Sequence, residues 1–152
     1  MFIVFALLFG IVSGMRAMTS PAAVSWASRA GIVAAAGTPL AFMGFQYTPI
    51  VFTLLAIGEL ISDKLPKTPS RKTPPAFIAR ILSGSLVGAT VGAASGSLVV
   101  GLIAGAVGAV AGTFGGAAFR SRLAAAFGKD LPAALVEDVT AIVLSIVIVT
   151  RF

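Results

Sequence analysis

The sequence predicts an all-α polytopic membrane protein of five or six membrane helices, some of them short or re-entrant, packed through glycines. The chain is 58% hydrophobic and only 11% charged, whereas about 25% of residues in soluble domains are charged. Residues 81–119 carry no charged side chain, enough for two spans of about 20 residues across a hydrocarbon core roughly 30 Å thick. Within that stretch Gly84, Gly88, Gly92 and Gly96 recur every four residues, which places small residues on one helix face.

Length and composition also bound the domain organisation and the chemistry. The 152 residues leave no room for a separate soluble domain, so we expect a single transmembrane domain over residues 1–152. The chain has neither cysteine nor histidine, which excludes disulfides, Ser-His-Asp nucleophiles and the usual zinc and haem sites. We predict that the protein is not an enzyme and needs no cofactor. A metal would require oxygen ligands, and its identity is left unknown.

The first apolar run predicts a helix over residues 2–18 that is retained rather than cleaved, because it lacks the basic start of a signal peptide. The residues at 19–21, Thr-Ser-Pro, are typical of a helix start. The alanine-rich segment that follows, residues 22–37, contains Arg29. We expect this segment to be short, re-entrant or interfacial, with a loop after it.

The next predicted helix covers residues 48–65 and carries Glu59 and Asp63. Four prolines then interrupt helical structure over residues 66–75. This loop is rich in lysine and arginine, so the positive-inside rule predicts that residues 64–75 face the cytoplasm of a bacterium, with the protein in the inner (cytoplasmic) membrane.

The uncharged stretch predicts two helices divided near residues 92–97. Their small faces allow two interpretations, which are packing within one chain and assembly into a homo-oligomer. The glycines expected to mediate helix packing are Gly84, Gly88, Gly92, Gly96, Gly101, Gly105, Gly108 and Gly112.

The last predicted helix runs from Asp130 to Val149 after a basic segment that contains Arg120, Arg122 and Lys129. That segment should return to the cytoplasm, which places the C-terminus outside. Asp130 with Pro132 is a favourable helix start.

An internal similarity relates residues 2–65 to residues 97–150, since each unit has a glycine-broken helix, a Gly-to-Arg step, an alanine-rich segment and a helix with a glutamate. Small transporters are often built from such repeats. If the alanine-rich segments are re-entrant, five helices cross and the units form an inverted repeat with Arg16 and Arg120 on opposite sides. If residues 22–37 cross, there are six spans and the N-terminus is outside.

Charged side chains in apolar helices are the candidate functional residues, because ionisable groups at membrane depth are costly and usually line an ion or solute path. The alternatives are simple charge neutralisation, stabilisation of carboxylates near a helix N-terminus, and snorkelling of arginines. Arg71 and Lys72 are interpreted as topology determinants. The candidate path consists of Glu59, Asp63, Glu137, Asp138, Arg16, Arg120 and Arg80.

The segment 58–66, Gly-Glu-Leu-Ile-Ser-Asp-Lys-Leu-Pro, resembles a small bacterial integral-membrane family that is classed as a domain of unknown function (number 4126). The Gly-Arg step after the first helix and the segment 80–84, Arg-Ile-Leu-Ser-Gly, are similar to that family too. The basic residues 67–72 depart from the acidic position expected after the proline. The resemblance implies a membrane fold and no particular activity.

These observations favour a small inner-membrane transporter or channel-like protein for an ion or small solute. The alternative is a structural or regulatory membrane protein that oligomerises through its glycine-rich faces. The net charge of +6 is interpreted as a topology signal with anionic lipid contact. The expected partners are therefore membrane lipid, a small ion or solute and a second copy of the chain, with no nucleic acid.

Overall fold

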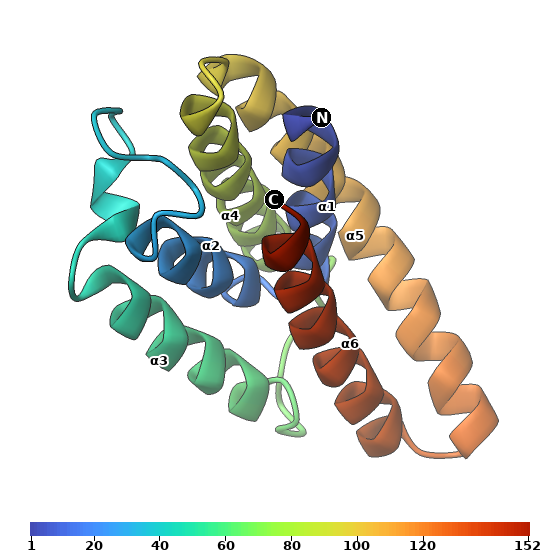
Figure 1. Cartoon of the computed structure of the whole chain (residues 1–152). Helices are drawn as coiled ribbons and strands as arrows, with labels where there is room; N and C mark the ends of the chain where they lie inside the picture. Colours follow the sequence, from blue (N-terminus) through green and yellow to red (C-terminus); the bar gives the residue numbers. More distant parts are fainter.

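The computed structural model describes all residues, 1–152, and its only regular elements are helices, which confirms the all-α part of the prediction (Figure 1). Three helices are long and apolar enough to cross a membrane, namely α4, α5 and α6. Two apolar helices, α1 and α3, are shorter. Three of the five or six predicted spans therefore have the length that a crossing requires. The elements are α1 (Phe2–Met15), α2 (Thr19–Arg29), the short 3₁₀ helix η1 (Ala41–Gly44), α3 (Thr48–Ser62), α4 (Pro74–Ala94), α5 (Leu98–Phe127) and α6 (Asp130–Arg151).

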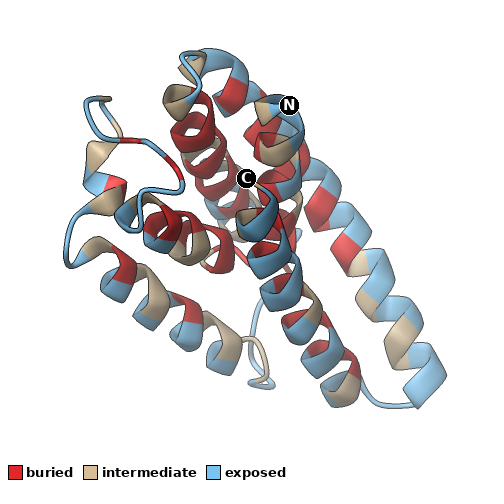
Figure 2. Ribbon diagram, in the orientation of Figure 1, coloured by how far each residue is buried: buried red, intermediate tan, exposed pale blue.

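Glycines hold α1, α4 and α5 together at backbone contact. A Cβ atom added at Gly88 would overlap the carbonyl oxygen of Gly101, and one at Gly105 would overlap that of Gly84. On its other side, α5 meets α1, where a Cβ atom at Gly112 would overlap the carbonyl oxygen of Ile11. The glycine faces are therefore occupied within the chain, and buried residues line this part of the bundle (Figure 2).

Gly96 is an exception among the predicted packing glycines. It lies between α4 and α5 with φ 75°, and a Cβ atom there would meet nothing within 4 Å. Its role is conformational, because a left-handed backbone is easy only for glycine. The expectation that Gly96 packs against another helix is wrong.

The break between α1 and α2 comes earlier than predicted. Helix α1 ends at Met15, Arg16 is extended with φ −139° and ψ 112°, and α2 begins at Thr19. From this point α2 leads away from α1 (Figure 1). Helix α2 ends at Arg29 instead of continuing to residue 37, where Gly31 and Gly37 take positive φ angles of 76° and 78°.

The chain ends and loops fall into two groups. Figure 1 shows both termini and the α4–α5 turn at one end of the molecule, and the α3–α4 loop and the α5–α6 turn at the other. The two basic segments predicted to face the cytoplasm therefore share one end. The C-terminus lies at the opposite end, as expected from the sequence.

The two proposed repeat units differ in one element. Helix α5 continues without a break through Arg120 to Phe127, whereas the corresponding part of the first unit is the separate helix α2. The alanine-rich residues after Arg120 thus extend a long helix and form no short segment of their own. The repeat itself stays a prediction.

Figure 2 shows much of α3, α5 and α6 as exposed, and many of the exposed residues on these helices are large and apolar. On α3 and α6, Leu54, Ile61, Val139 and Ile146 are each more than half exposed. Exposed apolar areas of this extent are unusual on soluble monomers and are typical of surfaces that meet lipid or another protein.

Candidate functional site

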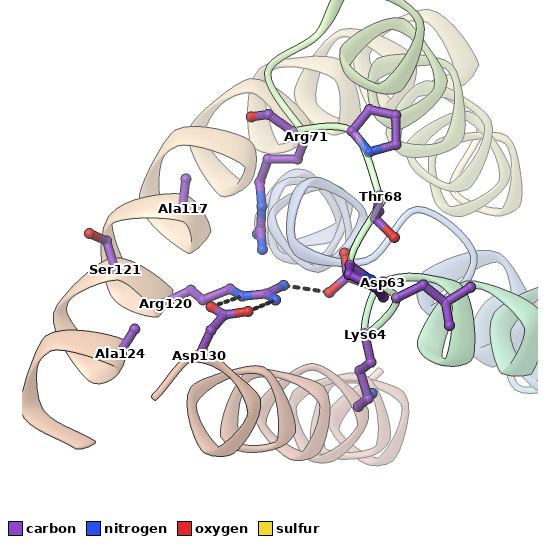
Figure 3. Close-up of a pocket in the computed structure, with 13 residues that line it drawn as sticks. Asp63, Lys64, Thr68, Arg71, Ala117, Arg120, Ser121, Ala124 and Asp130 are labelled. Atoms are coloured by element: carbon purple, nitrogen blue, oxygen red, sulfur yellow. Dashed lines mark hydrogen bonds and ion pairs between the residues drawn. The ribbon is translucent and has the colours of Figure 1, made fainter. Parts of the chain in front are cut away.

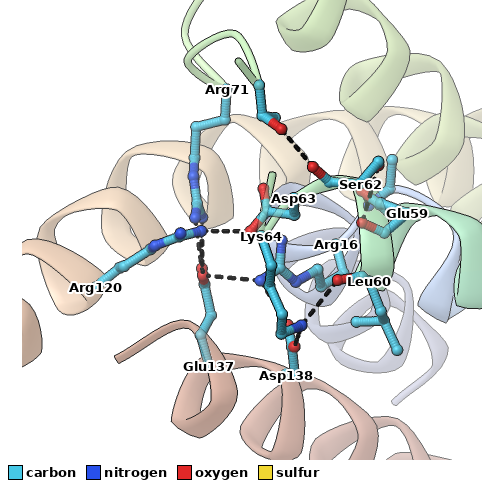
Figure 4. Close-up of polar contacts among 12 residues, drawn as sticks. Arg16, Glu59, Leu60, Ser62, Asp63, Lys64, Arg71, Arg120, Glu137 and Asp138 are labelled. Carbon is cyan, nitrogen blue, oxygen red and sulfur yellow. Dashed lines mark hydrogen bonds and ion pairs between the residues drawn. The ribbon is translucent and has the colours of Figure 1, made fainter. Parts of the chain in front are cut away.

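All five acidic residues of the chain form ion pairs: four are connected through shared bases, and the fifth, Glu59, pairs separately with Arg80. We call the connected group and the adjoining Glu59–Arg80 pair together the charge network, and Figure 4 shows most of it. It joins the α1–α2 break to α3, α4, α5, α6 and the α3–α4 loop, and it contains as many bases as acids. Its formal charge is therefore zero, and the +6 of the chain comes from bases outside it. Its members are Arg16, Glu59, Asp63, Lys64, Arg71, Arg80, Arg120, Asp130, Glu137 and Asp138.

Arg16 lies at the centre of the network and is completely buried. Its Nη1 is 2.7 Å from Asp63 Oδ2, and its Nη2 is 2.5 Å from Asp138 Oδ1 and 3.4 Å from Glu137 Oε2. The Nε atom makes no hydrogen bond. A charge without solvent is stable only when paired, so the three carboxylates explain how this arginine can be buried.

Glu137 is also completely buried, and its main partner comes from the α3–α4 loop. Nη1 and Nη2 of Arg71 donate to the two carboxylate oxygens of Glu137 at 2.5 and 2.8 Å. This bidentate geometry is the strong form of the arginine–carboxylate pair. The sequence indicates only a topology determinant at Arg71, since no local pattern links residues that lie 66 positions apart.

Lys64 ties the end of α3 to α6. Its Nζ pairs with Asp138 and donates to the carbonyl oxygen of Leu60 at 2.8 Å. Asp138 thus pairs with both Arg16 and Lys64, and α3 is held against α6 by charge.

Asp63 receives two arginines from opposite halves of the sequence, Arg16 and Arg120, on the same carboxylate oxygen. The five-span expectation that these arginines lie on opposite sides is therefore wrong. Burial alone would raise the pKa of Asp63, but the charges of Arg16 and Arg120 hold it below its ordinary value.

Arg120 also binds Asp130 at the start of α6 (Figure 3). Its Nε and Nη2 donate to the two Asp130 oxygens at 3.0 and 2.6 Å. The sequence pattern predicts only a helix start at Asp130, although an acid that follows a basic helix end after a tight turn is well placed for such a pair.

Glu59 has a different environment from the other acids. Its two oxygens accept hydrogen bonds from the backbone N–H groups of Ala17 (2.8 Å) and Met18 (2.9 Å), immediately before α2. Its only ion pair is with Nη2 of Arg80, at 3.7 Å. Glu59 therefore satisfies the N–H groups freed by the helix break, with the favourable charge for a helix N-terminus.

Arg80 holds the other side of the same break. Its Nε donates to the carbonyl oxygen of Gly14 at 3.1 Å, and its Nη1 donates to that of Ala76 at 3.4 Å. Next to it, Ser83 donates to the carbonyl oxygen of Ala17. Side chains from α3 and α4 thus satisfy the backbone groups that the break leaves without helical partners.

Two polar cavities adjoin the network. The larger, about 560 Å³, includes Lys64, Arg120 and Asp130 in its lining (Figure 3). The smaller, about 380 Å³, includes Glu59 and Arg80. Both volumes fall in the range of small-molecule sites. The cavities share Asp63, Thr68, Pro69 and Arg71, so the α3–α4 loop lies between them.

The structure brings every sequence-predicted path residue into the charge network, and each carboxylate has a basic partner within 4 Å. No group of three or more acidic side chains is arranged to hold a metal ion. Comparisons with protein-family models, with curated proteins and with solved structures find no match. The family resemblance inferred from the sequence stays a prediction.

Proposed function

We propose that the protein is a small multi-pass transporter or channel-like protein of the bacterial inner membrane that carries an ion or small solute. The main observation in support is the break between α1 and α2, where Arg16 and two backbone N–H groups contact carboxylates in the interior of the bundle. Discontinuous helices whose ends face charged groups are a recurring design of secondary transporters.

The depth of the network supports this proposal. Glu137 lies seven residues after Asp130, which is about 10 Å along the helix axis from the start of α6. A carboxylate placed there without function would be costly, since a charge at such depth must be paired or hydrated. The adjoining cavities provide space for a hydrated ion or a small solute beside the ion pairs.

Exchange of partners offers a physical route for the cargo. Asp63, Glu137 and Asp138 each contact more than one base, so one pair can open while another remains closed. A charged cargo could then replace one member of a pair without leaving a buried charge alone.

The alternative is a structural or regulatory membrane protein without transport. It is favoured by the complete pairing of Glu137, which is buried and bound by Arg71 on both oxygens. An assembly of copies would need a surface other than the glycine faces, because α1, α4 and α5 already occupy them. The exposed apolar face of α6 around Val139 is one such surface.

Flux measurements test the proposal. The purified chain in liposomes should conduct protons, alkali cations or small anions, each followed with a dye or an isotope. Glu59→Gln should reduce that flux, because an amide carries no charge for Arg80 and its NH₂ group cannot accept the second backbone N–H bond. Arg122→Gln is the control, since Arg122 is exposed and outside the network.

Absence of flux for every ion and solute, or unchanged flux in Glu59→Gln, would contradict the transport proposal. The structural alternative would then be tested with the variant Val139→Cys, since the natural chain has no cysteine. Disulfide-linked dimers of this variant in the membrane would indicate assembly through α6.

A further inference from the structure

The smaller cavity, which we call the Arg80 cavity, contains the most weakly paired base of the charge network. Nη2 of Arg80 makes no hydrogen bond and lies 3.7 Å from its carboxylate partner, Glu59. Glu59 already accepts two backbone N–H bonds. Arg71 and Arg120, in contrast, each bind a carboxylate through two nitrogens.

Burial makes this weak pairing costly. Arg80 is only 6% exposed, and a guanidinium withdrawn from water normally has its donors satisfied. The Arg80 side chain lines a cavity of about 380 Å³, together with Arg71 and the carboxylates of Glu59 and Asp63. The cavity therefore offers a cationic donor without a full partner.

Arg71 and the start of α4 add positive potential to the same space. Arg71 also lines this cavity, and it uses both Nη atoms on Glu137 and makes no hydrogen bond through its Nε. Helix α4 begins here, with Thr73 at its N-cap, prolines in its first turn and Ala76 in the cavity lining. The N-terminus of a 21-residue helix favours a negative charge.

We propose that the Arg80 cavity binds a small oxyanion, a phosphate or carboxylate group, with Arg80 as its charged anchor. If the oxyanion is the transported cargo, the proposal rests on the transport function proposed above. The binding site itself does not depend on that function. The oxyanion belongs either to a free anion or to the headgroup of an anionic phospholipid. Both present the planar or tetrahedral oxygens that arginine recognises.

Binding of inorganic phosphate and acetate to the purified full-length chain in detergent tests the anchor, by calorimetry. Arg80→Gln should weaken binding by roughly tenfold or more, the loss expected for a charge-assisted hydrogen bond. Arg122→Gln should leave binding unchanged, because this exposed base lies outside the cavity. Equal losses in both variants would overturn the proposal, since they would indicate diffuse attraction to basic loops.

Arg80 also supports the α1–α2 break through Gly14, so its variant can fail to fold. A second measurement keeps the native arginine and uses the absence of cysteine from the chain. Ala76→Cys places a thiol in the Arg80 cavity, and Ser121→Cys places one in the larger cavity only. The thiol at position 76 should react faster with an anionic than with a cationic methanethiosulfonate, and phosphate should slow its labelling. Phosphate should leave the labelling rate at position 121 unchanged.

Two versions of the labelling experiment distinguish the two sources of the oxyanion. Protection of the thiol at position 76 by inorganic phosphate without lipid supports a free anion. Protection by mixed micelles of detergent and phosphatidylglycerol, but not by inorganic phosphate, supports a lipid headgroup. Faster labelling by the cationic reagent, or no protection by either, would refute the site. Flux of another solute that depends on Glu59 would still leave the transport function standing.

Discussion

Among the single side chains, Arg16 determines how the buried acids are neutralised. It is the only base in contact with Asp63, Glu137 and Asp138 at once, and it reaches them because the chain is extended between α1 and α2. The pairing that the sequence led us to expect between arginines and helix acids is thus present. Its details differ, since one arginine serves three carboxylates while Glu59 is held mainly by backbone N–H groups.

Replacement of Arg16 should therefore be more damaging than replacement of another network base. Arg16→Met removes a completely buried charge and leaves its carboxylates short of a partner, which typically costs about 3–5 kcal/mol. Lys64→Met should cost less, because Asp138 keeps Arg16 and Lys64 is partly exposed. Denaturant unfolding in mild detergent, followed by circular dichroism, measures both. Equal losses would show that Arg16 is not the centre of the network.

Among the helices, α5 is the one that packs closely against two others. Its small residues face α4 and α1 together, and Gly105 meets Gly84 and Gly88 of α4 and Gly10 of α1. The four-residue spacing predicted close packing correctly. It could not identify the partner helix, because a glycine face looks the same whether the opposing backbone belongs to the same chain or to another copy.

Two glycines of α5 provide a matched test of this packing. Gly105→Ala should destabilise the fold by about 1–3 kcal/mol or more, because its Cβ atom would overlap backbone that has no flexible end to move. Gly115→Ala has open space around it and should stabilise the helix by up to about 1 kcal/mol. Thermal unfolding of the two variants in one detergent measures the difference. A destabilised Gly115→Ala or a neutral Gly105→Ala would contradict this packing.

Over the molecule as a whole, charge is unevenly distributed between the two ends. Exposed bases outside the network gather in the α3–α4 loop and near the α5–α6 turn, at Lys67, Lys72, Arg122 and Lys129. Figure 1 places these segments at the end opposite both termini. From the positive-inside rule we expect this end to face the cytoplasm, and the polar cavities beside the α3–α4 loop lie at the same end.

Single-cysteine labelling in cells tests this orientation. Phe152→Cys should react with a membrane-impermeant maleimide added to spheroplasts, because the C-terminus is expected outside. Lys129→Cys should react only after the membrane is permeabilised. The natural chain has no cysteine and serves as the unlabelled control. Reversed accessibility of the two positions would show that the topology is inverted.

The helical class, the apolar surfaces and the presence of acids that need partners could all be predicted from the sequence. Composition, hydropathy and glycine spacing are local properties, and they can be evaluated without knowing which segments meet. The order of the helices followed from proline and glycine positions for the same reason, with the main errors at the ends of α1, α2 and α5.

Which acid meets which base became known only when the helices were placed in space. The Arg16–Glu137 pair joins residues 121 positions apart, and the bidentate partner of Glu137 comes from a loop whose bases had suggested topology alone. The same holds for the glycine faces, which are equally suited to packing within one chain or between several. Pairing and close packing depend on distances in space, and these follow from how the whole chain satisfies its buried charges and backbone groups together.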